Sequence, residues 1–139
     1  MRKSKSSICL AVIAGIALMA GFARPQKTHR INAGVWGGEH IQLDVNSDSA
    51  AVEFDCAHGT IEGPLATDEN GEFSWKGRFA RERGGPVRRD ESDTSQPAVY
   101  SGSIKHQTMR LVVQLENDKE PLDTFVLVHG KDGRIRKCR

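Results

Sequence analysis

Short runs in which apolar and polar residues alternate are the feature that most constrains the fold of this chain. In residues 73–79, for example, phenylalanine, tryptophan, glycine and phenylalanine alternate with serine, lysine and arginine. Alternation with a period of two is typical of a β-strand that buries one face. From residue 34 to the C-terminus, no window places apolar residues at helical spacing over three turns. The sequence therefore predicts an all-β fold without a long helix.

Strand patterns of this kind recur about eight times, and tight turn sequences separate most of them. One such turn is Asp68-Glu69-Asn70-Gly71, in which the Asn-Gly pair favours the positive φ angles of a hairpin turn. A Gly37-Gly38 bulge would explain why Trp36 is out of phase with the apolar residues that follow it. Local hairpins favour a single antiparallel up-and-down meander, closed or nearly closed into a barrel, over a Greek-key sandwich. The expected strands are 35–45, 51–56, 60–62, 73–79, 98–104, 108–115, 125–128 and 134–138.

The first 23 residues have the three parts of a secretory signal peptide: a basic start, an uncharged apolar run and small residues before a cleavage point after Ala23. An uncleaved N-terminal anchor is the alternative interpretation. We expect residues 1–23 to be removed, residues 24–33 to form a flexible lead-in, and residues 34–139 to form one barrel domain. The expected location is periplasmic or extracellular, with no membrane span after cleavage.

Cleavage also changes the charge of the chain. It removes three of the 20 basic residues and none of the 18 acidic ones, so the net charge changes from +2 to −1. The basic character of the full sequence therefore comes from the signal, and the mature chain has no electrostatic signature of nucleic-acid binding.

Two of the three cysteines, Cys56 and Cys138, remain after cleavage, whereas Cys9 is lost with the signal. An even number of cysteines in an oxidising compartment predicts one disulfide, here closing a loop of about 80 residues. The alternative is a reactive or metal-binding thiol at Cys56. Strand alternation places Cys56 on the inward face with Phe54, and His58 shares that parity if the strand continues.

Four short stretches carry a resemblance: 36–40 (WGGEH), 55–59 (DCAHG), 82–88 (ERGGPVR) and 100–102 (YSG). In combination they resemble small uncharacterised secreted bacterial proteins, over nearly the whole mature chain. The glycine- and tryptophan-containing first strand and the meander also look, more loosely, like lipocalin-like barrels. The resemblance implies a secreted barrel and implies no particular activity.

A pocket, if present, is expected between the charged segment 81–88 and the end of the strand that carries Cys56. Polar side chains there could meet an anionic or polar group. The competing interpretation is that the arginines pair with neighbouring acids (Glu82, Asp90 or Glu91), and that bulky inward side chains fill the barrel. The candidate ligand-binding residues are His58, Arg83, Arg88, His40 and Trp36.

The leading hypothesis is a secreted, non-catalytic barrel that binds a small molecule or an envelope partner. A small hydrolase or metal-dependent enzyme using His58 and nearby carboxylates is the alternative from another class, and a structural or interaction domain with a filled core is a third. His40, His58 and Cys56 could converge on a metal, but they lack the paired spacing of zinc sites. The sequence predicts no catalytic residue, metal or cofactor, and leaves the oligomeric state open.

Overall fold

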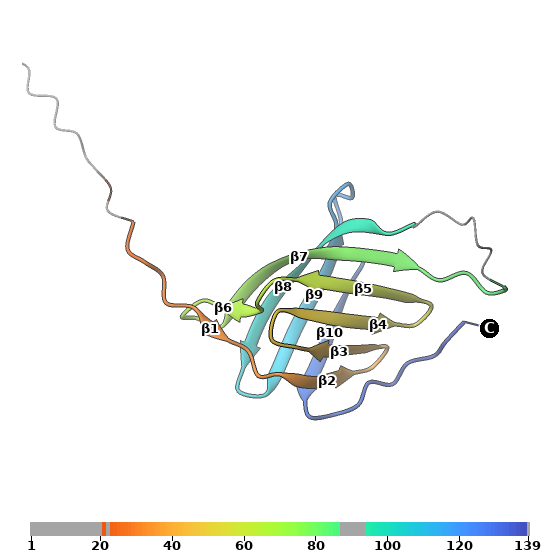
Figure 1. Ribbon diagram of the computed structural model, residues 1–139, viewed down its shortest axis with the longest axis horizontal. Helices are drawn as coiled ribbons and strands as arrows, with labels where there is room; N and C mark the ends of the chain where they lie inside the picture. Colours follow the sequence, from red (N-terminus) through yellow and green to blue (C-terminus); the bar gives the residue numbers. More distant parts are fainter. Residues whose placement is uncertain (1–20, 22, 87–93, 139) are drawn as a thin grey trace, which may run out of the picture.

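The computed structural model describes residues 21, 23–86 and 94–138, and eight of its strands form one closed antiparallel barrel (Figure 1). Each barrel strand pairs with the next one along the chain, and the last closes the barrel on the first through the pairing of Leu127 with Gly38. The predicted all-β up-and-down barrel is therefore confirmed. The barrel strands are β2 (Gly34–Gly38), β3 (Ile41–Val45), β4 (Ser49–Phe54), β5 (Ala57–Glu62), β7 (Glu72–Arg81), β8 (Gln96–Lys105), β9 (Thr108–Leu115) and β10 (Asp123–His129).

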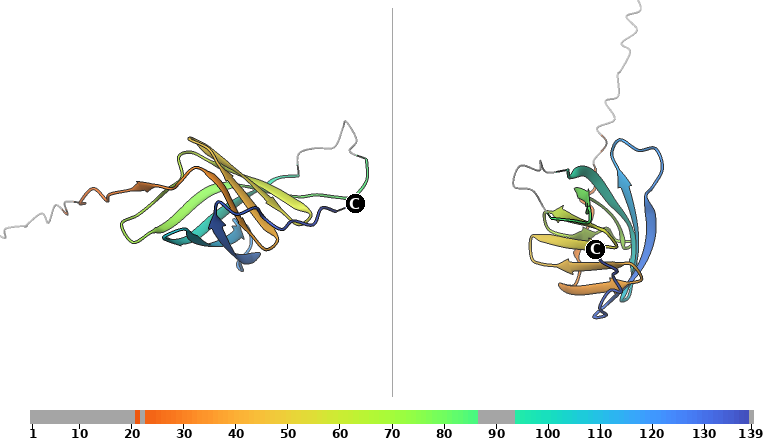
Figure 2. Two further views of the ribbon diagram at one scale, coloured as in Figure 1. Left: turned by 90° about the horizontal axis from the view of Figure 1, so that it is seen from below. Right: turned by 90° about the vertical axis from the view of Figure 1, so that its right-hand side faces the viewer.

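A second, two-stranded sheet lies at one end of the barrel, opposite the end that carries the C-terminal segment (Figures 1 and 2). It pairs β1 (His29–Arg30) with β6 (Ala66–Thr67). The backbone of Ile31 continues this contact by donating a hydrogen bond to the carbonyl of Leu65, at 3.1 Å. Within the described residues there is no helix long and apolar enough to cross a bilayer.

Two of the expected strands divide differently from the prediction. The segment expected as one strand over 35–45 is a hairpin of β2 and β3, whose two-residue turn places His40 at φ 65°. The expected bulge at Gly37-Gly38 is wrong, since the turn itself resets the alternation and buries Trp36 opposite Leu43. Of the two turn residues only His40 has positive φ, a conformation that favours glycine or asparagine, so the sequence Glu-His gives little sign of a turn.

Asp55 and Cys56 form a second two-residue turn, and residues 57–59, expected to follow the end of a strand, begin the next strand. β4 ends at Phe54, Cys56 has φ 54°, and β5 begins at Ala57. The expectation that one continued strand carries Cys56 and His58 on the same inward face is therefore wrong. His58 lies on the outward, exposed face of β5.

The expected last strand, 134–138, is also wrong. Among the described residues after β10, the one β-bridge is an isolated parallel pairing of Glu39 with Arg134, and the chain then continues toward the β4–β5 turn. No apolar alternation in 134–138 gives this segment a face to bury. The count of eight barrel strands is preserved because the segment 35–45 supplies two.

The C-terminal segment packs directly on the outer face of the β2–β3 hairpin, at a glycine. A side chain at Gly37 would overlap the backbone of Lys131, Asp132 and Gly133, and the backbone cannot move aside as a flexible side chain can. Gly37 is therefore required for the tail to lie against the barrel.

We expect Gly37→Ala to lower the free energy of unfolding by about 2 kcal/mol, within the range of overpacking substitutions. Thermal denaturation of the variant and the wild-type protein measures the change. Replacing glycine by alanine also reduces the freedom of the unfolded chain, and this effect alone would raise Tm. A Tm equal to or above that of the wild type would therefore show that the tail does not lie against Gly37.

The middle of the barrel is filled. Trp36, Trp75 and Tyr100 are buried, and each satisfies its polar atom with a backbone carbonyl: Asn32 at 3.0 Å, Ala66 at 2.9 Å and Arg78 at 2.8 Å, respectively. Buried indole N–H and phenol O–H groups need hydrogen-bond partners, and these three side chains have them, so their burial leaves no polar atom unpaired. The other fully buried large side chains are Ile41, Leu43, Val52, Ile61, Met109, Leu111, Val113 and Leu127.

Candidate functional site

A cavity of about 550 Å³ opens at the end of the barrel formed by the β2–β3 and β4–β5 turns. This volume lies in the range of small-molecule sites. Its wall is mostly apolar, and polar groups gather at its rim. The apolar residues are Phe54, Ala57, Phe79, Val113, Leu122 and Phe125, and the others are His40, Asp55, Cys56, Arg81, Glu82 and Asp123.

Three phenylalanines from separate strands form the aromatic part of the wall. The ring centroid of Phe54 lies 5.4 Å from that of Phe79, edge-on, and 5.4 Å from that of Phe125. Phe54 is buried, whereas Phe79 and Phe125 are only partly buried. The barrel is therefore filled in its middle and hollow at this end, so neither a wholly filled interior nor a wholly hollow one describes it.

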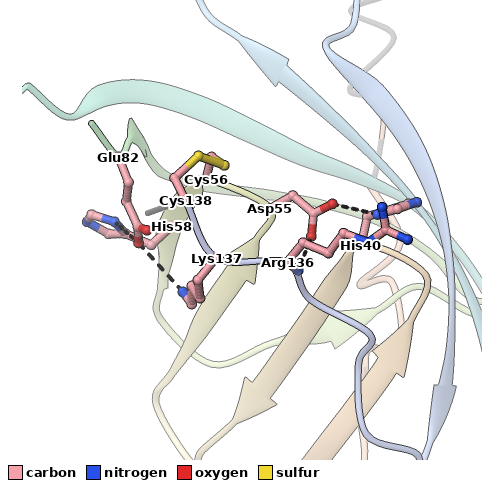
Figure 3. The surroundings of a disulfide bond; sticks show 8 residues. All are labelled: His40, Asp55, Cys56, His58, Glu82, Arg136, Lys137 and Cys138. Atoms are coloured by element: carbon pink, nitrogen blue, oxygen red, sulfur yellow. Dashed lines mark hydrogen bonds and ion pairs between the residues drawn. A yellow bond between two sulfur atoms is a disulfide. The ribbon is translucent and has the colours of Figure 1, made fainter. Parts of the chain in front are cut away.

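The predicted disulfide, Cys56 to Cys138, fixes the chain end beside this cavity (Figure 3). The two Cα atoms are 4.9 Å apart, and the residues are separated by 82 positions in the sequence. The carbonyl of Cys56 also accepts a hydrogen bond from the backbone N–H of Glu82, at 2.8 Å. Cys56 thus joins three segments at the rim: the β4–β5 turn, the end of β7 and the C-terminal tail.

Asp55 is the hydrogen-bond acceptor that connects the tail to the β2–β3 turn. One carboxylate oxygen accepts the backbone N–H of Arg136 at 2.6 Å, and the other lies 2.6 Å from Nδ1 of His40 (Figure 3). The Arg136 N–H and, to a smaller degree, the His40 side chain hold the pKa of the Asp55 carboxyl below its usual value, against the opposing effect of desolvation.

Glu82 lies in a second, more exposed group of charges on the other side of the disulfide. Its Oε1 is 3.2 Å from Nδ1 of His58 and 3.6 Å from Nζ of Lys137, which also lies 3.4 Å from Oε2 of Glu53. Solvent-exposed pairs of this kind contribute at most about 1 kcal/mol each. Their effect is mainly to occupy the Glu82 carboxylate and to keep the tail near the rim.

The low pKa of Asp55 predicts a pH-dependent contribution to stability. A carboxyl whose pKa is lower in the folded state stabilises the fold when ionised, and this contribution is lost as the pH falls through the folded-state pKa. We expect Asp55→Asn to lower Tm by about 3 °C at pH 7 and by progressively less as the pH falls toward 2, because the wild-type carboxyl takes up its proton as the pH falls through its lowered pKa.

Thermal denaturation of both proteins across this pH range measures the difference. Glu62→Gln, on the exposed outer face of β5, is the matched control and is expected to behave like the wild type at both pH values. A Tm difference for Asp55→Asn that is the same at pH 7 and pH 2 would show that ionised Asp55 does not hold the tail.

The candidate residues predicted from the sequence lie in different places. His40 lines the cavity, but Trp36 is buried away from it, with its ring centroid 4.9 Å from that of His129. His58 lies outside the cavity on the outer face of the barrel, and Arg83 is exposed and does not line the cavity. Arg88, like Asp90 and Glu91, lies outside the described residues.

The expected position of the pocket, between the segment that begins at Arg81 and the stretch around Cys56, agrees with the cavity found. Sequence reasoning missed Arg81 and Asp123 as rim residues. Both share the inward parity of their strands, Arg81 with Phe79 and Asp123 with Phe125. Both would have been identified by extending the alternation of apolar residues by two positions, beyond the end of the β7 pattern for Arg81 and before the start of the β10 pattern for Asp123.

Within the described ranges, no group of three or more histidine, cysteine, aspartate or glutamate side chains is arranged to hold a metal ion. Comparison of this chain with protein-family models, with curated proteins and with solved structures found no match.

Proposed function

We propose that this protein is exported and binds a small, largely apolar molecule, without catalysis, in the cavity at the disulfide end of the barrel. The observation that carries the proposal is the cavity of about 550 Å³, walled by Phe54, Phe79 and Phe125 and lined at its rim by polar side chains. Apolar concave sites with a few converging polar groups are the usual form of a small-molecule site.

The cavity favours a small molecule over an envelope protein as the bound partner. A concave site enclosed by strands on several sides suits a ligand that inserts, whereas protein partners use larger surfaces. The Cys56–Cys138 disulfide supports export to a periplasmic or extracellular location, where such bonds persist. The signal peptide proposed over residues 1–23 falls almost wholly outside the described residues. Its removal would appear as the corresponding loss of mass in protein purified from its source.

Titration with an uncharged apolar fluorophore, N-phenylnaphthylamine, tests the binding function. Phe125 and Val126 are neighbours on β10 that face opposite sides of the barrel wall, and Val126 is 59% exposed. We expect Phe125→Gln to weaken binding about tenfold, since it removes apolar contact area from the cavity, and Val126→Gln to leave binding within about twofold of the wild type. Tm measurements establish that both variants fold.

Two results would contradict the proposed function. The first is the absence of saturable binding to the wild-type protein. The second is equal weakening by both substitutions, which would place the fluorophore on the outer surface of the barrel.

A hydrolytic function is the second candidate, favoured by one specific observation. His40 Nδ1 is 2.6 Å from the Asp55 carboxylate at the cavity rim, which leaves Nε2 as the nitrogen available to accept a proton from water or substrate. This candidate uses His40 where the sequence pointed to His58. Hydrolysis of chromogenic esters that persists in His40→Gln would remove the support for it.

A further inference from the structure

Among the described residues that line the cavity, Arg81 is the one arginine or lysine, and its side chain lies exposed at the cavity mouth. On β7 the residues at alternate positions, Phe73, Trp75 and Phe79, project into the barrel, and Arg81 continues this set two positions later. The same alternation places Arg83 beyond the end of the strand, outside the cavity lining. Arg81 is thus placed at the mouth by the strand itself.

The acidic groups around Arg81 are engaged elsewhere. Asp55 is held by the Arg136 N–H and by His40, and Glu82 lies beside His58 and Lys137. In contrast, the Arg81 guanidinium makes no hydrogen bond or ion pair with any residue that the structure describes.

Asp123 is the remaining acid of the lining. Its Oδ1 accepts the backbone N–H of the adjacent Thr124 at 2.7 Å, and its carboxylate forms no ion pair within the described part of the chain. Asp123 could therefore favour a cationic ligand instead. The test has to distinguish anion binding at Arg81 from cation binding at Asp123.

A guanidinium suits an anionic ligand in both charge and geometry. Its planar array of donors binds carboxylate or phosphate oxygens with two parallel hydrogen bonds, which are stronger than hydrogen bonds between neutral groups. Because Arg81 is exposed at the mouth, an ion pair there is only partly shielded from solvent, by the apolar wall formed by Phe54, Phe79 and Phe125.

We propose that the ligand of the cavity is an amphiphilic anion whose apolar body packs against the three phenylalanines and whose acidic head group binds Arg81. This inference rests on the proposed binding function and specifies the chemical class of its ligand. Carboxylate and phosphate head groups share the required chemistry. The Asp123 carboxylate lies on the same rim and repels negative charge, so a head group with fewer negative charges is favoured.

The test compares four ten-carbon compounds that differ in the head group: decanoate, decyl phosphate, uncharged decanol and decyltrimethylammonium. The ionic compounds are used below their micellar concentrations and decanol below its solubility limit. Calorimetric titration of the wild-type protein is expected to give a Kd for the better of the two anions about tenfold lower than for decanol, the effect of one charge-assisted contact of about 1.4 kcal/mol. The order of decanoate and decyl phosphate shows which head group the site prefers. The cationic compound is expected to bind more weakly than decanol.

Three variants assign this preference to a residue. In Arg81→Gln the anions are expected to bind no more tightly than decanol, with the Kd of decanol itself within about twofold of wild type. Asp123→Asn is expected to keep or strengthen anion binding. Arg83→Gln, which removes an arginine outside the cavity lining, is expected to match the wild type.

The failures of this inference and of the proposed function are distinguishable. If decanol binds and neither anion binds more tightly, or if Arg81→Gln keeps the preference for anions, the inference is overturned and the binding function stands. Tightest binding of the cationic compound, lost in Asp123→Asn, also overturns it. If none of the four compounds binds, the proposed function is contradicted as well.

Discussion

Removing the disulfide is expected to lower the free energy of unfolding by about 4 kcal/mol. Cys56 and Cys138 are 82 positions apart, so the bond restricts a long loop in the unfolded chain, and the loss of that restriction dominates the effect. Denaturation of Cys56→Ala/Cys138→Ala by urea, compared with wild-type protein verified to have the bond formed, measures it. A loss of about 4 kcal/mol is a large fraction of the free energy of unfolding of a typical single domain.

The tail keeps other contacts in the absence of the sulfur bridge. Arg134 donates a backbone hydrogen bond to Gly38 at 2.9 Å and accepts one from His40 at 2.9 Å. We therefore expect the double variant to remain folded at room temperature, with a smaller denaturant midpoint and an unchanged barrel circular dichroism signal. A loss below about 1 kcal/mol would contradict the role given to the disulfide.

Truncation of Tyr100 is the second substitution with a large expected effect. Tyr100 is fully buried and its hydroxyl donates to the Arg78 carbonyl on the adjacent strand β7, and a side chain at Gly59 on the next strand, β5, would overlap this hydroxyl. We expect Tyr100→Ala to cost about 4 kcal/mol, because the filled middle of the barrel cannot collapse around the missing ring. Chemical denaturation, analysed for the change in midpoint and slope, measures this cost.

Tyr100→Phe is the matched control for the ring. It keeps the packing and removes only the hydrogen bond of 2.8 Å to Arg78, so a cost of about 1 kcal/mol is expected. Burial raises the pKa of the Tyr100 hydroxyl well above its usual value, so the group stays a hydrogen-bond donor at alkaline pH. Equal costs for the alanine and phenylalanine variants would show that the ring does not support the barrel.

The fold class could be predicted because alternation with a period of two depends only on which residues are apolar. It gave the strands around Phe73 and Met109 correctly, and the turn at Asp68–Gly71 is present, with Asp68 Oδ1 accepting the N–H groups of Asn70 and Glu72 at 2.9 Å each. The two cysteines gave the disulfide. The strand and turn signals depend on residues close together in the sequence, and the disulfide follows from the number of cysteines. Neither requires knowledge of the three-dimensional arrangement.

The turns that shape the cavity could not be predicted in the same way. His40 and Cys56 adopt positive φ without glycine, so their sequences gave no sign of a hairpin turn, and His58 was consequently placed on the wrong face. For the candidate site, the sequence indicated the region, and of the five candidate ligand-binding residues His40 lines the cavity.

The most direct test of the central claim, that the hollow end of the barrel is a ligand site, is the map of backbone amide chemical shifts recorded during titration with decanol. The account predicts saturable shifts concentrated at Phe54, Ala57, Phe79, Val113 and Phe125, which line the cavity, and unchanged shifts at Trp36 and around the β1–β6 sheet at the other end. Shifts spread over the outer faces of the strands, or concentrated at the β1–β6 end, would contradict it.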